Sequence, residues 1–120
     1  MRHYTTKEQT AKLMDLGFAE PEGIFDTDLR IETFAKTNII KTDKYGYEYA
    51  LENYTIGDLI AFLEEYHFPT HIRVGGAKVN NVINQNHEEF GGELIDLLFN
   101  LCVKIKEEEI ICGKVDMIMN

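Results

Sequence analysis

Two histidines, four positions apart, form the pair in this chain with the most familiar metal-binding spacing. If a helix ran through His67 and His71, both imidazoles would lie on one face and could ligate one metal ion. Pro69 lies between them, and a proline removes a backbone N–H and forces the preceding residue out of the helical conformation. No third ligand lies nearby in the sequence. We therefore predict two solvent-facing histidines and no metal site.

Two other stretches match ligand-binding loops only in part. Asp26 and Asp28 alternate like the carboxylates of a calcium loop, but the glycine and the later glutamate of such a loop are missing. The stretch 75–78, Gly-Gly-Ala-Lys, contains the glycines and lysine of a phosphate-binding loop without the Gly-x-x-x-x-Gly-Lys-Ser/Thr spacing. These patterns favour a solvated acidic loop and a hairpin turn, respectively.

The two cysteines do not form a recognisable reactive or metal-binding arrangement. Cys102 and Cys112 are too few for a zinc quartet or a disulfide framework. A nucleophilic cysteine needs an exposed thiol and a neighbouring base, whereas Cys102 lies in an apolar stretch and Cys112 has no evident partner. We predict no catalytic, cofactor-binding or metal-ligating residues in this chain.

Three helices are expected to organise the fold, near residues 5–16, 55–66 and 90–107. The first two begin at Thr5 and Thr55, each followed three positions later by an acidic residue that can complete a capping box. The third has the widest apolar face, and the glycines at 91 and 92 favour a start closer to Glu93. Its stripe consists of Phe90, Leu94, Leu97, Leu98, Leu101 and Ile105, widened by Ile95, Phe99 and Cys102.

The segments between these helices predict short strands. Residues 29–34, 37–41 and 47–49 are rich in β-branched and aromatic residues, and 70–83 indicates a hairpin that turns at Gly75-Gly76. Residues 85–89 are polar and are expected to connect this hairpin to the last helix. The sequence therefore predicts one α+β domain over residues 1–120, with three helices packed on a small, mainly antiparallel sheet.

The segment 110–120 is apolar and follows the last predicted helix. It contains Ile110, Ile111, Val115, Met117, Ile118 and Met119, interrupted by Gly113. An apolar tail of this kind is rarely left exposed. We expect it either to pair with the sheet or to pack on a second copy of the chain.

Charge and composition narrow the classes of function. The chain of 120 residues has 21 acidic and 12 basic residues and a formal net charge of -9. This charge on average repels phosphate backbones and argues against direct nucleic-acid binding. No apolar run is long enough for a membrane span, and the N-terminal residues do not have the pattern of a signal peptide. A cytoplasmic location without membrane attachment is the resulting expectation.

Three segments resemble a known group of proteins: MRHYTTKEQT at 1–10, YTIGDLIAFL at 54–63 and GGELIDLL at 91–98. They are similar to small uncharacterised proteins of phages and conjugative elements from gut anaerobic bacteria. Those proteins open with a similar helix, carry an aromatic-Ser/Thr-Leu-Gly-x-Leu-Leu segment at the centre and end on an amphipathic helix. The family has no assigned activity, so the resemblance implies a mobile-element context and no functional residues.

Three hypotheses on function follow. The first is an accessory protein that binds a protein partner or forms a homodimer, which agrees with the apolar tail and the lack of a catalytic constellation. The second is an acidic inhibitor that imitates nucleic acid and binds a basic host protein. The third is a small enzyme of unrecognised class, which would need a concave pocket with converging polar groups.

Overall fold

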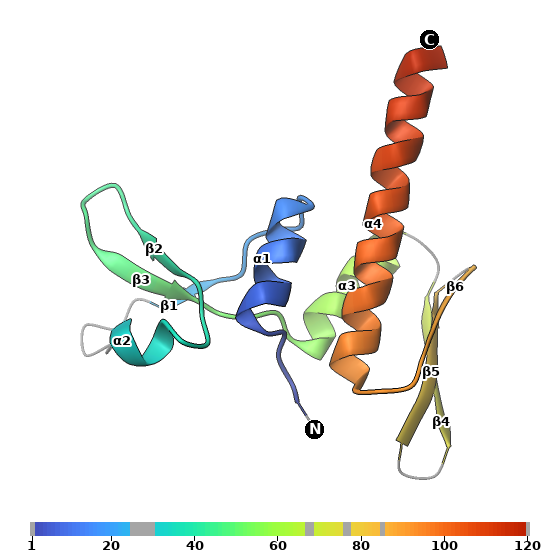
Figure 1. The fold of residues 1–120 in the computed structure, drawn as a ribbon, viewed down its shortest axis with the longest axis horizontal. Coiled ribbons are helices and arrows are strands. Elements are labelled where there is room, and N and C mark those ends of the chain that lie inside the picture. The colour runs from blue at the N-terminus through green and yellow to red at the C-terminus, as the bar shows by residue number, and fades with distance from the viewer. Residues whose placement is uncertain (1, 25–30, 67–68, 76–77, 85, 120) are drawn as a thin grey trace. The chain divides into compact units, whose positions relative to one another are not determined.

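The computed structural model describes residues 2–24, 31–66, 69–75, 78–84 and 86–119, without the side chains of Tyr66, Lys78 and residues 111–119. The described residues form helices and two antiparallel sheets, so the predicted α+β class is confirmed (Figure 1). In chain order the elements are α1 (Lys7–Asp15), β1 (Gly23–Ile24), α2 (Ile31–Phe34), β2 (Ile40–Thr42), β3 (Glu48–Leu51), α3 (Ile56–Tyr66), β4 (Thr70–Gly75), β5 (Lys78–Asn84), β6 (His87–Phe90) and α4 (Leu94–Met119).

The chain divides into two compact units, which we describe separately. One consists of Tyr4–Tyr54, and the other of Met1–His3 with Thr55–Asn120. The helices predicted near 5–16, 55–66 and 90–107 correspond to α1, α3 and α4. Instead of one sheet, however, there are two of three strands each, with the strand orders β1-β3-β2 and β4-β5-β6. The assignment of residues 1–120 to a single domain stays a prediction.

In the first unit, α1 begins one residue later than the sequence indicates. Thr6 is the N-cap, and its hydroxyl accepts a hydrogen bond from the backbone N–H of Gln9 while the Gln9 side chain accepts one from the N–H of Thr6. Thr5, which was predicted to cap the helix, is buried instead. Its backbone N–H donates to the carbonyl of Tyr54, and its hydroxyl accepts from the Tyr54 N–H. Thr5 therefore joins the two ends of this unit.

The expected strand over residues 29–34 is wrong in its second half, because Ile31–Phe34 forms the short helix α2. Residues 29 and 30 lie outside the described part of the chain. Ile31 and Phe34 are half-buried, whereas Glu32 and Thr33 are exposed. A spacing of three places two apolar residues on one helical face, while a strand would have placed Glu32 on the same face as Phe34. The strand predicted at 37–41 is confirmed in part by β2.

In the second unit, α3 and α4 pack on each other and lie on one face of the sheet β4-β5-β6 (Figure 1). The capping box predicted for α3 is confirmed: the Thr55 hydroxyl accepts from the Asp58 N–H at 3.0 Å, and Asp58 Oδ2 accepts from the Thr55 N–H at 2.9 Å. The hairpin predicted over 70–83 is also confirmed, since β4 and β5 are antiparallel and Gly75 lies opposite Lys78. The turn was predicted at Gly75-Gly76; Gly75 is the last residue of β4, and residues 76 and 77 lie outside the described chain.

The apolar stripe of α4 forms much of the core, as predicted. Six of its residues are buried with at most 3% of their surface exposed: Ile95, Leu97, Leu98, Leu101, Cys102 and Ile105. From α3, Leu59 and Leu63 are buried as well. Because apolar burial is the main stabilising contribution to folding, these residues account for much of the stability of this unit.

Phe90 is the exception in this stripe, and its assignment to the helix is wrong. It is the last residue of β6 and is 67% exposed. Gly91 and Gly92 follow with φ angles of +68° and +112°, which residues with side chains rarely adopt. They separate the strand from α4, which begins at Leu94, close to the later start that the glycines indicated.

The polar connection predicted at 85–89 is also wrong, because residues 87–90 form strand β6. His87 and Glu89 point toward α4, where His87 Nε2 lies 2.5 Å from Glu108 Oε2 and Glu89 Oε1 lies 2.5 Å from Lys104 Nζ. Polar side chains on the inner face are thus matched by polar side chains on the helix. This explains why hydrophobicity alone does not reveal the strand.

Beyond the core, α4 continues to Met119 and includes most of the apolar segment 110–120. Whether this segment pairs with the sheet or with a second chain stays a prediction. Among the described helices, none combines the length and the apolar character that crossing a membrane requires.

Candidate interaction site at the edge of the second sheet

Strand β4 is the element of the second unit with the least protection from solvent. It forms one edge of the sheet, since it pairs with β5 on one side and with no described strand on the other. Its sequence, Thr-His-Ile-Arg-Val-Gly, favours an extended conformation through its β-branched residues. The backbone N–H and C=O groups along the outer edge of such a strand are available to another chain.

The inner face of β4 is apolar but only partly covered. Ile72 lies opposite Val82, which is fully buried, and Val74 lies opposite Val79. However, Ile72 remains 37% exposed and Val74 62% exposed. The helices pack on β5 and β6 and reach β4 less extensively. The core therefore ends at an apolar margin along this strand.

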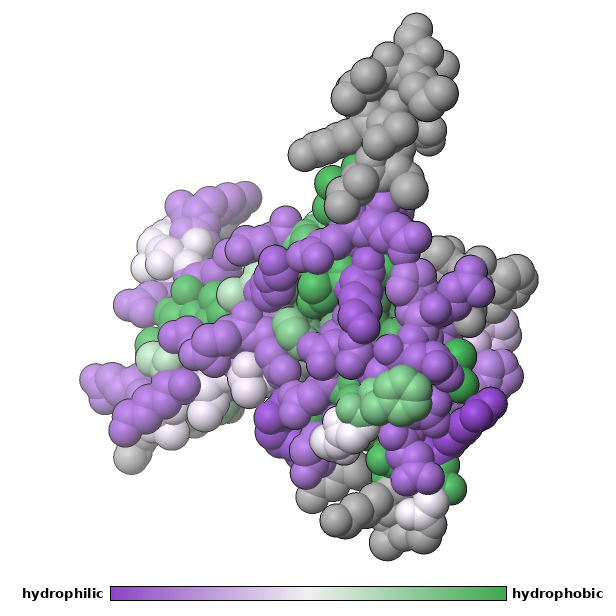
Figure 2. Space-filling view, turned by 45° about the vertical axis from the view of Figure 1, so that its right-hand side comes forward, coloured by the Kyte–Doolittle hydropathy of each residue, from purple (hydrophilic) through white to green (hydrophobic). Residues whose placement is uncertain are grey.

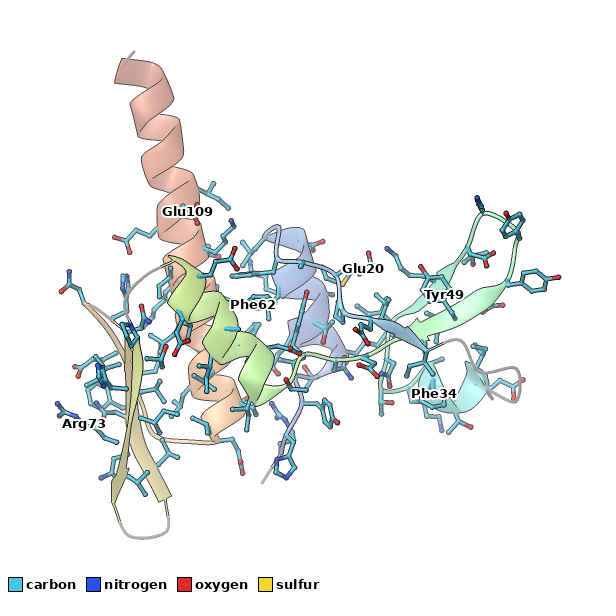
Figure 3. The ribbon with its side chains drawn as sticks, turned by 180° about the vertical axis from the view of Figure 1, so that it is seen from behind. Glu20, Phe34, Tyr49, Phe62, Arg73 and Glu109 are labelled. Atoms are coloured by element: carbon cyan, nitrogen blue, oxygen red, sulfur yellow. The ribbon has the colours of Figure 1, made fainter. Side chains whose placement is uncertain are left out.

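The outer face of β4 carries His71 and Arg73, both exposed. Figure 3 shows Arg73 projecting from the side of β4 that faces away from α3 and α4. Across the sheet, Arg73 aligns with Asn81 of β5 and then with Phe90 of β6. Arg73 takes part in none of the ion pairs found among the described residues. This edge is thus apolar on one face and basic on the other.

The opposite edge of the sheet, β6, has a different character. It is four residues long and includes Glu88 and Glu89, and its inner side chains are held to α4 by the two side-chain contacts described above. Short length and charged side chains are the usual means by which proteins prevent an edge strand from pairing. Of the two edges, β4 is therefore the one that is suited to binding.

The first unit has an exposed aromatic pair of its own. Tyr45 and Tyr47 are 73% and 72% exposed in the loop between β2 and β3, where Asp43 Oδ1 accepts hydrogen bonds from both of their backbone N–H groups. The Lys44 ammonium lies 5.0 Å from the centre of the Tyr45 ring. Figure 2 shows apolar areas separated by hydrophilic ones over the visible surface. The two tyrosines provide a comparison for β4 in the experiments below.

Electrostatic shifts in the described residues are consistent with structural roles. Burial raises the pKa of the Cys102 thiol to about 12, and its sulfur lies 3.7 Å from the carbonyl oxygen of Leu59. A thiol in this state is protonated and unreactive near neutral pH. In the first unit, the hydrogen bond from Lys41 to Glu20, at 2.8 Å, raises the pKa of the lysine. Neither group indicates a reactive centre.

Of the residues singled out from the sequence, the three that the structure describes lie in different settings. His71 is exposed on β4, Gly75 ends that strand and Cys102 is buried in the core. His67, Asp26, Asp28, Gly76 and Ala77, as well as the side chains of Lys78 and Cys112, lie outside the described part of the chain. Among the described residues, no three His, Cys, Asp or Glu side chains lie close enough together to hold a metal ion.

The edge position of β4 is the feature that sequence reasoning missed. The hairpin over 70–83 was predicted, but a hairpin pattern does not say which of its strands pairs with a third one. The third strand, at 87–90, has the composition of a polar connection, because its inward side chains His87 and Glu89 contact Glu108 and Lys104 of α4. Comparisons of this chain with protein-family models, with curated proteins and with solved structures found no significant match.

Proposed function

We propose that this chain is a small cytoplasmic accessory protein of a mobile genetic element and that it acts by binding another protein. The mobile-element context comes from the resemblance of residues 1–10, 54–63 and 91–98 to proteins of phages and conjugative elements. The mode of action comes from β4. An extended segment of the partner pairs with the outer edge of this strand and adds a fourth strand to the sheet.

One observation carries the proposal: every residue from His71 to Gly75 is exposed although the strand continues a buried core. In recognition by strand addition, backbone hydrogen bonds provide affinity, and alternate side chains provide specificity. Thr70–Gly75 offers six residues for such pairing. Ile72 and Val74 offer apolar surface that the added strand would cover.

The test compares the chain with two variants that each place a lysine at an exposed apolar position. Val74→Lys introduces a charge on the inner side of the β4 edge, and Tyr47→Lys introduces one in the first unit at a position of similar exposure. Each protein is immobilised and exposed to host-cell extract. We expect the chain and the Tyr47→Lys variant to retain the same partner and the Val74→Lys variant to lose it.

Hydrogen exchange on the purified complex supplies the direct readout. Binding by strand addition should slow the exchange of those β4 amides that point away from β5, because they gain hydrogen-bond acceptors. A partner that leaves β4 exchange unchanged, or that all three proteins retain equally, would refute the proposal. Light scattering on the chain alone shows whether the partner is a second copy.

A further inference from the structure

The side chains that flank the outer edge of β4 specify what kind of segment would fit beside it. Side chains alternate along a strand, so Thr70, Ile72 and Val74 lie on the inner face with the buried Val82, and His71 and Arg73 lie on the outer face. The pairing with β5 shifts in register between Arg73 and Val74, and the alternation along β4 itself continues. Resting on the proposed function, we infer that the segment which pairs with β4 alternates apolar and acidic residues. Its apolar side chains lie beside Ile72 and Val74, and its carboxylates lie beside Arg73.

The apolar half of this pattern follows from the incomplete cover over the inner face. Directly opposed residues in a sheet lie about 5 Å apart and point to the same face. A residue of the added strand opposite Ile72 or Val74 would thus lie at the margin of the core that contains Val82. An apolar side chain there removes surface of both partners from water, whereas a charged one would lose part of its hydration.

The acidic half follows from Arg73. Among the described residues, no ion pair joins Arg73 to a carboxylate of the chain, and Glu88, which lies on the same face of the sheet, accepts a hydrogen bond from Asn81 at 3.3 Å instead. A guanidinium can form two parallel hydrogen bonds with a carboxylate, which fixes both distance and orientation. A Glu or Asp in the added strand, on the same face as Arg73, would supply that partner. Opposite charges across neighbouring strands favour pairing, and like charges oppose it.

The same charges argue against a second copy as the occupant. Two β4 strands that pair antiparallel, with both helix layers on one side, must place inward residues opposite inward residues. Two registers meet this condition with the longest overlap, and each pairs five residues of one copy with five of the other. One is centred on Ile72 and places His71 opposite Arg73 of the other copy, and the other places Arg73 opposite Arg73. Neither register supplies a carboxylate to the guanidinium.

The experiment uses the full chain and two capped synthetic peptides of eight residues, one alternating valine with glutamate and one alternating valine with lysine. Binding is measured by titration calorimetry. We expect the valine–glutamate peptide to bind the chain at least tenfold more tightly than the valine–lysine peptide. The Arg73→Glu variant should reverse this preference, and Arg73→Gln should reduce it. Lys36→Glu, an equal charge change at an exposed position in the first unit, should leave it unchanged.

The outcomes separate this inference from the proposed function. If both peptides bind equally well and Val74→Lys weakens both, strand addition stands and the acidic preference is wrong. If neither peptide binds, strand addition fails and the inference fails with it. If Lys36→Glu reverses the preference as strongly as Arg73→Glu, the effect is one of net charge, and the assignment to Arg73 is wrong. A dimer of the chain that Val74→Lys dissociates would identify a second copy as the occupant and overturn the inference.

Discussion

Replacing Leu98 with alanine should strongly destabilise the second unit. Leu98 is fully buried on α4. The substitution removes three carbon atoms, worth roughly 2.5 kcal/mol of transfer free energy at about 0.8 kcal/mol per carbon. The cavity that remains adds to this cost, and buried leucine-to-alanine changes destabilise proteins by about 2–5 kcal/mol in total. We expect the free energy of unfolding to fall within that range.

Phe90→Ala provides the matched control, because the sequence places both residues in one apolar stripe while the structure separates them. Phe90 is 67% exposed at the end of β6. Its replacement should therefore cost less than about 1 kcal/mol, as is usual for surface positions. Urea unfolding followed by circular dichroism measures both changes. A cost below about 1 kcal/mol for Leu98→Ala, or equal costs for the two variants, would refute the assigned core.

Three further predictions concern single groups. Tyr54→Phe should lower the free energy of unfolding in urea by about 0.5–1.5 kcal/mol, because the hydroxyl of this buried tyrosine donates a hydrogen bond of 2.6 Å to the carbonyl of Ala19. No loss of stability would show that this bond contributes nothing. Gly92→Ala should lower the free energy of unfolding more than Gly91→Ala, because a φ of +112° is less accessible to alanine than a φ of +68°. An added Cβ meets no atom within 4 Å at either position, so only the backbone angle distinguishes them. Equal costs in urea unfolding would contradict this. Raising the pH above about 9 should lower the free energy of unfolding by up to about 1.4 kcal/mol per pH unit through Cys102. The pKa of this thiol is raised to about 12 in the folded state, so the unfolded state loses the thiol proton first. This part of the pH dependence should be absent in Cys102→Ala, and an unchanged slope in that variant would exclude Cys102 as its cause.

Local signals in the sequence were sufficient to place α1, α3 and the start of α4, but not α2, which the sequence predicted as part of a strand. Thr55 and Asp58 predicted the start of α3 because a capping box depends only on residues three apart. The stripe of α4 predicted its buried face for a similar reason, since helical periodicity is set by the chain itself. The glycines at 91 and 92 also indicated a later start for α4, as observed.

The failures at residues 85–90 and at the candidate site share a different cause, which is that the decisive contacts are distant in sequence. Phe90 continues the spacing of the α4 stripe, but it belongs to a strand that pairs with β5. His87 and Glu89 have the polarity of loop residues, and only their contacts with Glu108 and Lys104 of α4 explain their place in a strand. The candidate site was missed for the same reason, because the exposure of β4 depends on the order of three strands. Single-residue properties contain no information on that order.

The contacts between β6 and α4 also fix how far the helix is displaced along the sheet. His87 and Glu89 are two residues apart in a strand, a rise of about 6.8 Å. Their partners, Glu108 and Lys104, are four residues apart in a helix, a rise of about 6 Å. The two spacings are similar, so both contacts form together, and one residue inserted into β6 between Glu88 and Glu89 would turn Glu88 toward the helix and His87 toward water. Natural variants of this fold should therefore differ in the composition of β6 more readily than in its length.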